Sequence, residues 1–258
     1  MTRAVPVLVE IPHAGCEIPT ELRARLAPFE HDLRRDADLY VDELFDRVPE
    51  RGATLLTARL SRYVVDLNRS ETDTDARTTD ATPVSHAPAP RGVVWRETAD
   101  GRPLFQSPLT RNDFGQRLDR FYRPYHQALT AAVTALREQH GHAIIVSAHS
   151  MPSSDGAARA DIVPGTRSRT TAHEDVIDAV ETHFRSAGLS VRHDNPYRGG
   201  ATTARWGQPA RGFHAIQIEV NRRLYMDEVT LARRSDTMVW LAALCAQLVD
   251  RLGSIVLR

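Results

Sequence analysis

Two histidines and a glutamate stand in strand-like segments of this 258-residue sequence, where they could hold or use a metal ion. His13 follows the apolar run "VLVEI", and His149 lies near the end of "AIIVSAHS". Glu219 lies inside "AIQIEVN", where side chains alternate, so it shares a strand face with Gln217 and Asn221. Imidazoles and a carboxylate can bind a catalytic zinc ion that keeps one position for water. The pattern favours a metal-assisted hydrolase.

Each of these residues also has a structural interpretation. A histidine at a strand end is most often a hydrogen-bonded structural residue, and Glu219 could pair with one of the many arginines. The sequence has no HExxH motif and no tight cysteine cluster. The segment "YVVDLNR" adds Asp66, Asn68 and Arg69 at the end of another predicted strand. Parallel strands end at one edge of a sheet, where α/β folds place their sites.

The composition excludes several function classes. All 33 basic residues are arginine, so the chain has neither a Schiff-base lysine nor a P-loop lysine. Pyridoxal-phosphate enzymes and ordinary P-loop nucleotide hydrolases are therefore excluded. The 33 acidic residues balance the charge, so we expect neither nucleic acid nor a membrane as a partner.

The chain is predicted to be cytoplasmic and to form a single domain. Its two cysteines, Cys16 and Cys245, form neither a metal-type spacing nor a disulfide framework. The N-terminal apolar stretch is too short for a signal peptide, and no later stretch approaches a membrane span. We expect one domain over residues 1–258, with a loop-rich excursion at about 71–108.

Strand-like and helix-like segments alternate along the chain. Apolar runs predict strands at 5–11, 142–150 and 213–223, one or two strands in 53–70, and a short strand at "LSVRHD". Helices are predicted at "ELRARL", 36–48, 171–188, 227–252 and, as the longest, from Asn112 to His140. Thr110 should cap the long helix, Pro124 should kink it, and Gly141 should end it. This alternation predicts an α/β fold, a three-layer sandwich with a mostly parallel central sheet.

Seven blocks, in order, resemble the N-formylglutamate amidohydrolase family. They are "IPHAGCEIP", "DADLYVDELF", "SRYVVDLNR", "RPYH", "SAHSMPS", "NPYRGG" and "AIQIEVNRRLYMDE", within roughly residues 5–230. That family is similar in fold to zinc carboxypeptidases and aspartoacylases, which implies a zinc-exopeptidase or phosphorylase/hydrolase-like architecture. The resemblance implies hydrolysis of a linear amide bond that releases formate, or another small acyl group, from an N-formyl or N-acyl amino acid. N-formylglutamate is the leading candidate, and histidine degradation is the implied setting.

The resemblance also implies a metal site. Zinc, or another divalent ion, is expected on His13, His149 and a carboxylate. We expect that carboxylate to be Asp38, with Asp36 and Glu17 as alternatives. Asp42, one helical turn from Asp38, is expected to orient a ligand, and Cys16 is expected to be a spectator.

In the implied reaction Glu219 takes a proton from water and returns it to the leaving amine. Arg69 steadies the oxyanion or clamps a substrate carboxylate, which its planar fork can bind bidentately. In "YRGGATTARWG" (197–207), Ala204 stands where the family has an arginine, and Arg205 follows it. Amino acids other than glutamate therefore stay open as substrates. The expected substrate contacts are Asn68, Arg69, Ser150, Arg198, Gly199, Gly200, Arg205 and Asn221.

Two other classes of function stay open. A metal-free hydrolase could use Cys16, or Ser147 or Ser150, with a histidine, although no GxSxG elbow is present. A non-catalytic binding protein on the same fold is the second alternative, and the two histidines with Glu219 count against it. The expected partner is a small molecule, and a homo-oligomer is left open.

Overall fold

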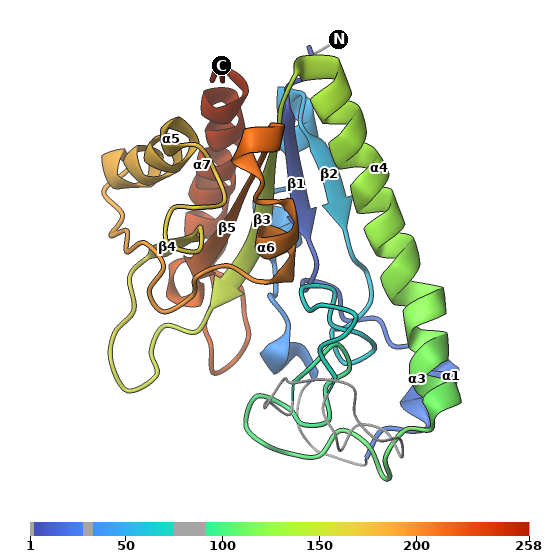
Figure 1. The fold of residues 1–258 in the computed structure, drawn as a ribbon. Coiled ribbons are helices and arrows are strands. Elements are labelled where there is room, and N and C mark those ends of the chain that lie inside the picture. Colours follow the sequence, from blue (N-terminus) through green and yellow to red (C-terminus); the bar gives the residue numbers. More distant parts are fainter. Residues whose placement is uncertain (1–2, 28–32, 75–90, 258) are drawn as a thin grey trace. The chain divides into compact units, whose positions relative to one another are not determined.

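The computed structural model describes residues 3–27, 33–74 and 91–257, which divide into two compact units (Figure 1). The first unit, here the sheet unit, comprises Met1–Ile11, Tyr40–Thr57 and Leu129–Arg258. The second, here the insert unit, comprises Pro12–Leu39 and Ala58–Ala128. The single domain stays a prediction. Residues 75–90 of the expected excursion lie outside the described residues.

The sheet unit is built on a five-stranded, mostly parallel sheet. Neighbouring strands pair in parallel, except that β4 runs antiparallel to β5. Every residue of β1 and of β3 is buried, as expected when helices cover both faces of a parallel sheet. The predicted α/β fold is confirmed. In sheet order the strands are β2 (Thr54–Thr57), β1 (Val7–Ile11), β3 (Ala143–Met151), β5 (Phe213–Asn221) and β4 (Ile162–Gly165).

Helices flank this sheet (Figure 1). Helix α7 (Ser235–Gly253) packs against α2 (Val41–Leu44), α5 (Glu174–Ser186) and β1, while α6 (Ala201–Trp206) packs on β3 and β5. None of the helices in the described part of the chain is both long enough and apolar enough to cross a membrane. The shorter 3-10 turns of this unit are η2 (Val48–Arg51), η4 (Pro209–Arg211) and η5 (Arg222–Leu224).

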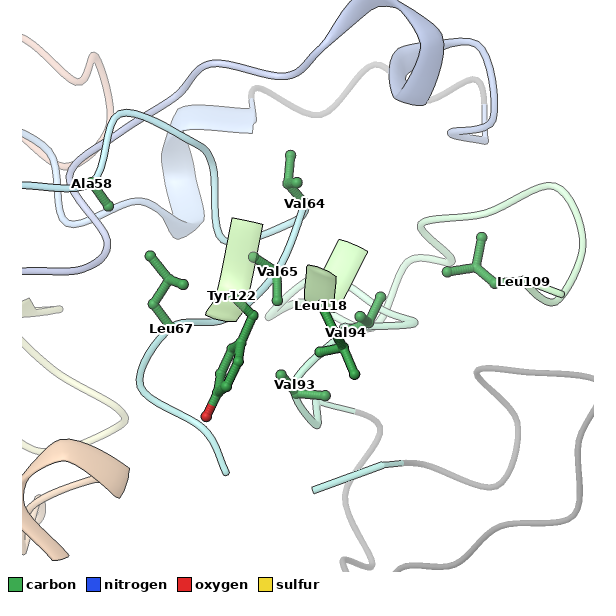
Figure 2. Close-up of a cluster of buried hydrophobic side chains, with 9 residues drawn as sticks. All are labelled: Ala58, Val64, Val65, Leu67, Val93, Val94, Leu109, Leu118 and Tyr122. Carbon is green, nitrogen blue, oxygen red and sulfur yellow. The ribbon is translucent and has the colours of Figure 1, made fainter. Parts of the chain in front are cut away.

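The insert unit packs around its own apolar cluster rather than around a sheet. Figure 2 shows this cluster, in which Val64, Val65 and Leu67 lie with Leu118 and Tyr122. Its helical elements are α1 (Thr20–Arg23), η1 (Leu33–Asp36), α3 (Arg111–Arg117), the π-helical η3 (Leu118–Tyr122) and the first turns of α4 (Arg123–His140).

The predicted strand at "YVVDLNR" is wrong, because this segment forms turns within the insert unit. Its backbone groups find partners elsewhere. The buried Arg117 donates from Nη1 to the Val64 carbonyl at 2.8 Å, and the Asp66 amide donates to the Val93 carbonyl at 2.7 Å. Strand pairing is therefore not needed to satisfy the backbone here.

Three further predicted elements are shorter than expected. The helix at 36–48 is broken, because Tyr40 adopts a left-handed φ of 65° before α2. "LSVRHD" forms only an isolated bridge between Val191 and Ile162. The last helix begins at Ser235 rather than at 227, because the Asp227 side chain accepts hydrogen bonds from the following amides and closes a turn. Strand β4 and helix α6 were not predicted.

The long predicted helix is confirmed as a continuous run of α3, η3 and α4. Thr110 caps it, since its side chain accepts from the Asp113 amide in a capping box. Gly141 ends it with a φ of 83°. The π-helical turn lies directly before Pro124, which has no N–H to continue the regular ladder.

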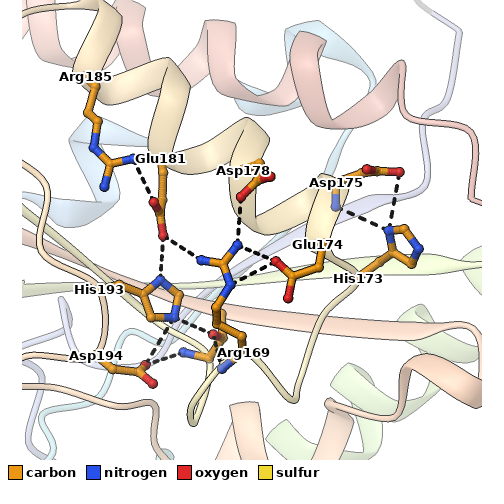
Figure 3. Close-up of polar contacts among 10 residues, drawn as sticks. Arg169, His173, Glu174, Asp175, Asp178, Glu181, Arg185, His193 and Asp194 are labelled. Carbon is orange, nitrogen blue, oxygen red and sulfur yellow. Dashed lines mark hydrogen bonds and ion pairs between the residues drawn. The ribbon is translucent and has the colours of Figure 1, made fainter.

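A polar network ties the loop before α5 to that helix (Figure 3). Arg169, whose φ of 62° is left-handed, donates to Glu174, to Asp178 at 2.7 Å and to Glu181 at 3.1 Å. Glu181 also accepts from Arg185 and lies 2.7 Å from the Nδ1 atom of His193. This network holds in place a loop whose backbone is strained at several non-glycine residues.

Candidate functional site

In the insert unit, His13 and Asp38 are buried and joined through the backbone. The Asp38 amide donates to the His13 carbonyl at 2.9 Å, and the Nδ1 atom of His13 lies 3.5 Å from Oδ2 of Asp38. Gly15 allows the chain after His13 to pass close to Arg59, since a Cβ at Gly15 would lie 2.2 Å from the Arg59 carbonyl. The two side chains are therefore fixed together by local structure.

Asp66 orients the imidazole of His13. Its Oδ1 lies 2.7 Å from Nε2 of His13, and its Oδ2 accepts from Nη2 of Arg62 at 2.8 Å and from Nε1 of Trp95 at 2.9 Å. When Nε2 donates to this carboxylate, the lone pair of the neutral ring stays on Nδ1, on the side of Asp38. Carboxylate–histidine pairs of this kind orient many metal-binding histidines.

The environment keeps Asp66 ionised. Burial alone would raise the pKa of this carboxyl, but the charges of His13 and Arg62 outweigh burial, and the hydrogen bond from His13 adds to them. The pKa of Asp66 is therefore held well below its usual range.

Asp42 was expected to orient a ligand, and its exposed position corrects this expectation. Asp42 is exposed in the first turn of α2, while Asp38 lies before that helix, so the two do not share a helical face. The sequence signal for Asp66 was its place in "DLNR", but the pairing with His13 depends on residues 53 positions apart.

The other two carboxylates that were considered as ligands have different partners. Asp36 accepts from the Tyr63 hydroxyl at 2.6 Å and from the Ala99 amide at 2.7 Å. Glu17 is exposed and pairs with Arg59 at 2.7 Å. Asp38 is thus the carboxylate best placed to act with His13.

Arg69 follows Asp66 closely and carries a buried guanidinium nitrogen whose hydrogen-bonding capacity is unused among the described residues. Its Nε is buried and has no hydrogen-bond partner among the described residues. Its carbonyl accepts from the Tyr122 hydroxyl at 2.8 Å, and the Asn68 amide donates to Oδ1 of Asp66 at 2.9 Å. An unsatisfied buried N–H is costly, which is consistent with a site for an oxygen anion.

In the sheet unit, His149 and Glu219 lie side by side on neighbouring strands. The register of β3 and β5 pairs His149 with Glu219 and Ser147 with Gln217. Because side chains two residues apart share a face, all four lie on one face of the sheet. All four are buried. The placement of Glu219 beside His149 agrees with the predicted strand patterns.

A chain of hydrogen bonds fixes the carboxylate of Glu219. The Gly200 amide donates to Oε1 of Gln217 at 2.8 Å, so Nε2 of Gln217 faces Glu219 and donates to its Oε1 at 2.8 Å. The loop that contains Gly199 and Gly200, here the glycine loop, passes close to Gly165 on β4. Glycine at 165 allows this approach, because a Cβ there would lie 2.7 Å from the Gly199 amide nitrogen. Gln217 thereby links the glycine loop to the carboxylate of Glu219.

The remaining candidate residues have identifiable contacts at the ends of strands and in loops. Arg198 is exposed and donates to the Ser168 hydroxyl, and Arg205 is exposed and donates to Thr130 at 3.4 Å.

Ser150 accepts from Nε of Arg222 at 3.1 Å. The side-chain amide of Asn221 donates from Nδ2 to the Ala160 carbonyl at 3.0 Å, and its Oδ1 accepts from the Arg223 backbone amide at 3.1 Å. Their contacts with substrate stay predictions.

The chemistry of the donor set fits a metal ion. His13 and Asp38 in the insert unit and His149 in the sheet unit are all buried, and each offers one atom that can bind a metal ion. Two imidazole nitrogens and a carboxylate oxygen are a ligand set that zinc accepts in catalytic sites, with water as the fourth ligand. Cys16 is not part of this set, and its Sγ lies 3.7 Å from the Ala14 carbonyl.

Comparison with known proteins finds relatives over most of the chain. Residues 5–226 match the family described as N-formylglutamate amidohydrolase. The chain is 30% identical to N-formylglutamate deformylase of Pseudomonas putida over 87% of this chain and 83% of that protein. It is also 30% identical to the Pseudomonas aeruginosa deformylase, over 96% and 92%. The crystal structure of N-formylglutamate amidohydrolase from Ralstonia eutropha matches with a TM-score of 0.89 at 31% identity, over 97% and 94%.

The family match over residues 5–226 spans parts of both compact units. The relatives are covered over most of their own length, so the likeness is not confined to one segment. The chain belongs to the N-formylglutamate amidohydrolase family.

Proposed function

We propose that this chain is a metal-dependent deformylase that hydrolyses the amide bond of an N-formyl amino acid and releases formate. The observation that carries the proposal is the buried set of His13, Asp38 and His149, in a chain whose relatives are named N-formylglutamate deformylases. N-formylglutamate is therefore the first substrate to test. A cytoplasmic location and a place in histidine degradation belong to the same proposal.

The metal would be held by His13, Asp38 and His149, with zinc as the first candidate. A zinc ion bound there would supply a Lewis acid and lower the pKa of a water ligand to about 7. His13 suits the role because Asp66 holds its Nε2 at 2.7 Å and leaves Nδ1 on the side of Asp38.

Glu219 is the proposed general base. It accepts the proton of the attacking water on its carboxylate and hands it to the amine that leaves. Gln217 donates to Oε1 of Glu219 at 2.8 Å, which orients the carboxylate of the proposed base. The pairing with His149 in the sheet keeps this base beside a proposed ligand.

Arg69 is the proposed anion clamp. Its buried Nε has no partner among the described residues, and a guanidinium can bind a carboxylate or an oxyanion through two parallel hydrogen bonds. Arg198 and Arg205 are exposed on the glycine loop and on α6, where they are candidates for the second carboxylate of a glutamyl substrate. Contacts from these two arginines would determine which N-formyl amino acid the enzyme prefers.

The test is formate release from a panel of N-formyl amino acids. The panel contains N-formylglutamate, N-formylaspartate, N-formylglutamine and N-formylmethionine, with N-acetylglutamate as a probe of the acyl group. Each is assayed with metal-loaded protein, with protein treated with a chelator, and after zinc is returned. We expect N-formylglutamate to be cleaved fastest, and activity to vanish with the chelator and return with zinc.

Two results would contradict the proposal. Full activity in protein shown to be free of metal, together with inactivation by a thiol reagent, would favour the cysteine mechanism through Cys16. No formate from any substrate with metal-loaded protein would leave a binding protein as the better description.

A further inference from the structure

We propose that Glu10 and Ser147 are positioning residues that set the tautomer of His149, so that its Nδ1 carries the lone pair for the metal. The proposal rests on the proposed function, because it assigns His149 as a ligand. It concerns residues of the sheet unit only.

The three side chains form a continuous buried chain across two strands. Glu10 and Ser147 are register partners on β1 and β3, and His149 lies two residues further along β3 on the same face. Their exposed fractions are 0%, 1% and 3% in that order. Bulk water therefore does not compete for their hydrogen bonds.

The direction of the hydrogen bonds follows from counting protons. The hydroxyl of Ser147 donates to Oε1 of Glu10 at 2.7 Å. A serine hydroxyl has a single proton, so toward His149 its oxygen can act only as an acceptor. The Nε2 atom of His149 lies 3.0 Å from that oxygen and must then be the protonated nitrogen. A neutral ring with its proton on Nε2 has its lone pair on Nδ1.

The tautomers of His13 and His149 are thus fixed in the same way, by different groups. Asp66 accepts a hydrogen bond directly from Nε2 of His13, at 2.7 Å. For His149 the carboxylate of Glu10 acts through a hydroxyl placed between the two. In both cases a buried carboxylate fixes which nitrogen is available to a metal.

A pair of variants with the same shape isolates the hydroxyl. Ser147→Thr keeps the acceptor and adds a methyl group, while Ser147→Val has nearly the same shape without the oxygen. Any packing cost of the added methyl is common to both variants. Two measurements are made: zinc affinity by competition with a chromogenic chelator, and the tautomer of His149 in metal-free protein by ¹⁵N-edited NMR, with the signals assigned through the His149→Gln variant.

The two variants are expected to differ in the tautomer of His149 and in zinc affinity. Ser147→Thr should show the Nε2-protonated ring and a zinc affinity near that of the unaltered protein. Ser147→Val should lose the single tautomer and bind zinc about 10–100-fold more weakly, the usual effect of losing a group that orients a metal ligand. Glu10→Gln should weaken zinc binding as well, because an amide can donate to Ser147 and turn its hydroxyl toward His149.

Equal zinc affinity and equal tautomer in Ser147→Thr and Ser147→Val would overturn the proposal. If both variants fold poorly, Glu10→Gln decides, and an unchanged tautomer in that variant also overturns it. The tautomer is measured without metal or substrate. Failure to release formate from any substrate would therefore refute the proposed function. The tautomer of His149 in metal-free protein would still test the role of Ser147 and Glu10.

Discussion

At the scale of single residues, the site depends on groups that hold its histidines in one orientation. The sequence favoured His13, Asp38, His149 and Glu219 because their types and their order in the chain resemble a family pattern, and their roles stay predictions. The orienting role of Asp66 could not be predicted, because it depends on how a segment of turns folds back onto His13. Sequence spacing predicts neighbours along a helix or a strand, but not this kind of long-range contact.

Asp66→Asn should weaken metal binding about 10–100-fold, because an amide cannot serve as the charged acceptor of His13, Arg62 and Trp95 together. The measurement is zinc affinity by chelator competition. Asp36→Asn is the matched control, since Asp36 bonds to Tyr63 and Ala99 instead of to a proposed ligand. The account is wrong about Asp66 if the two variants bind zinc equally well.

Arg69→Lys should lower kcat/KM for the best substrate by about 10–150-fold, which corresponds to roughly 1.5–3 kcal/mol for a hydrogen bond to a charged group. Lysine keeps the charge but loses the planar fork that a carboxylate needs. Steady-state kinetics of Arg69→Lys beside Arg59→Lys, an exposed control paired with Glu17, would check it. Unchanged kinetics in Arg69→Lys would show that Arg69 is structural.

At the scale of elements, the sequence predicted best where one strand or helix is regular and long. The apolar runs of β1, β3 and β5 and the capped long helix were predicted, since burial and capping leave clear patterns. Strand β4, "IVPG", is only four residues long and pairs antiparallel, and α6 is six residues long. Elements this short are decided by packing rather than by periodicity.

Gly165→Ala should lower both stability and activity. A Cβ there would lie 2.7 Å from the Gly199 nitrogen and 2.9 Å from the Arg198 carbonyl carbon, so the glycine loop must shift away from Gln217. Overpacking of this kind costs about 1–3 kcal/mol. Thermal unfolding and deformylase kinetics on the same preparation would measure both effects.

Gly115→Ala is the control for this substitution. Gly115 lies inside α3 with nothing within 4 Å of an added Cβ, so alanine should stabilise the helix by about 0.5–1 kcal/mol and leave activity unchanged. Loss of activity in Gly115→Ala, or unchanged activity in Gly165→Ala, would contradict the idea that activity depends on the position of the glycine loop.

At the scale of the whole chain, stability should fall in mild acid because His214 is buried without charge. Burial, followed by the neighbouring His142 and His173, lowers the pKa of His214 from 6.5 to about 4. Between these values the unfolded chain binds a proton that the folded chain does not, so the free energy of unfolding decreases as pH falls. The decrease attributable to His214 is at most about 3 kcal/mol by pH 4.

The His214→Asn variant tests this pH dependence. An amide oxygen can still accept from the His173 amide, which donates to Nδ1 of His214 at 3.1 Å, but it does not titrate. Urea unfolding at pH 8.0 and 5.0 should show a smaller difference in the variant than in the unaltered chain. Equal differences would assign the acid sensitivity to other groups.

The central claim is that a metal held by His13, Asp38 and His149 works with Glu219 as the base, and Glu219→Gln tests it most directly. Glutamine keeps the shape of the side chain and can keep a contact with Gln217, but it cannot take a proton. Formate release and zinc content are measured on the same preparation. The account predicts that turnover falls by about 10²–10⁴-fold while zinc stays at the level of the unaltered protein. Near-normal turnover in Glu219→Gln, or loss of zinc together with activity, would contradict it.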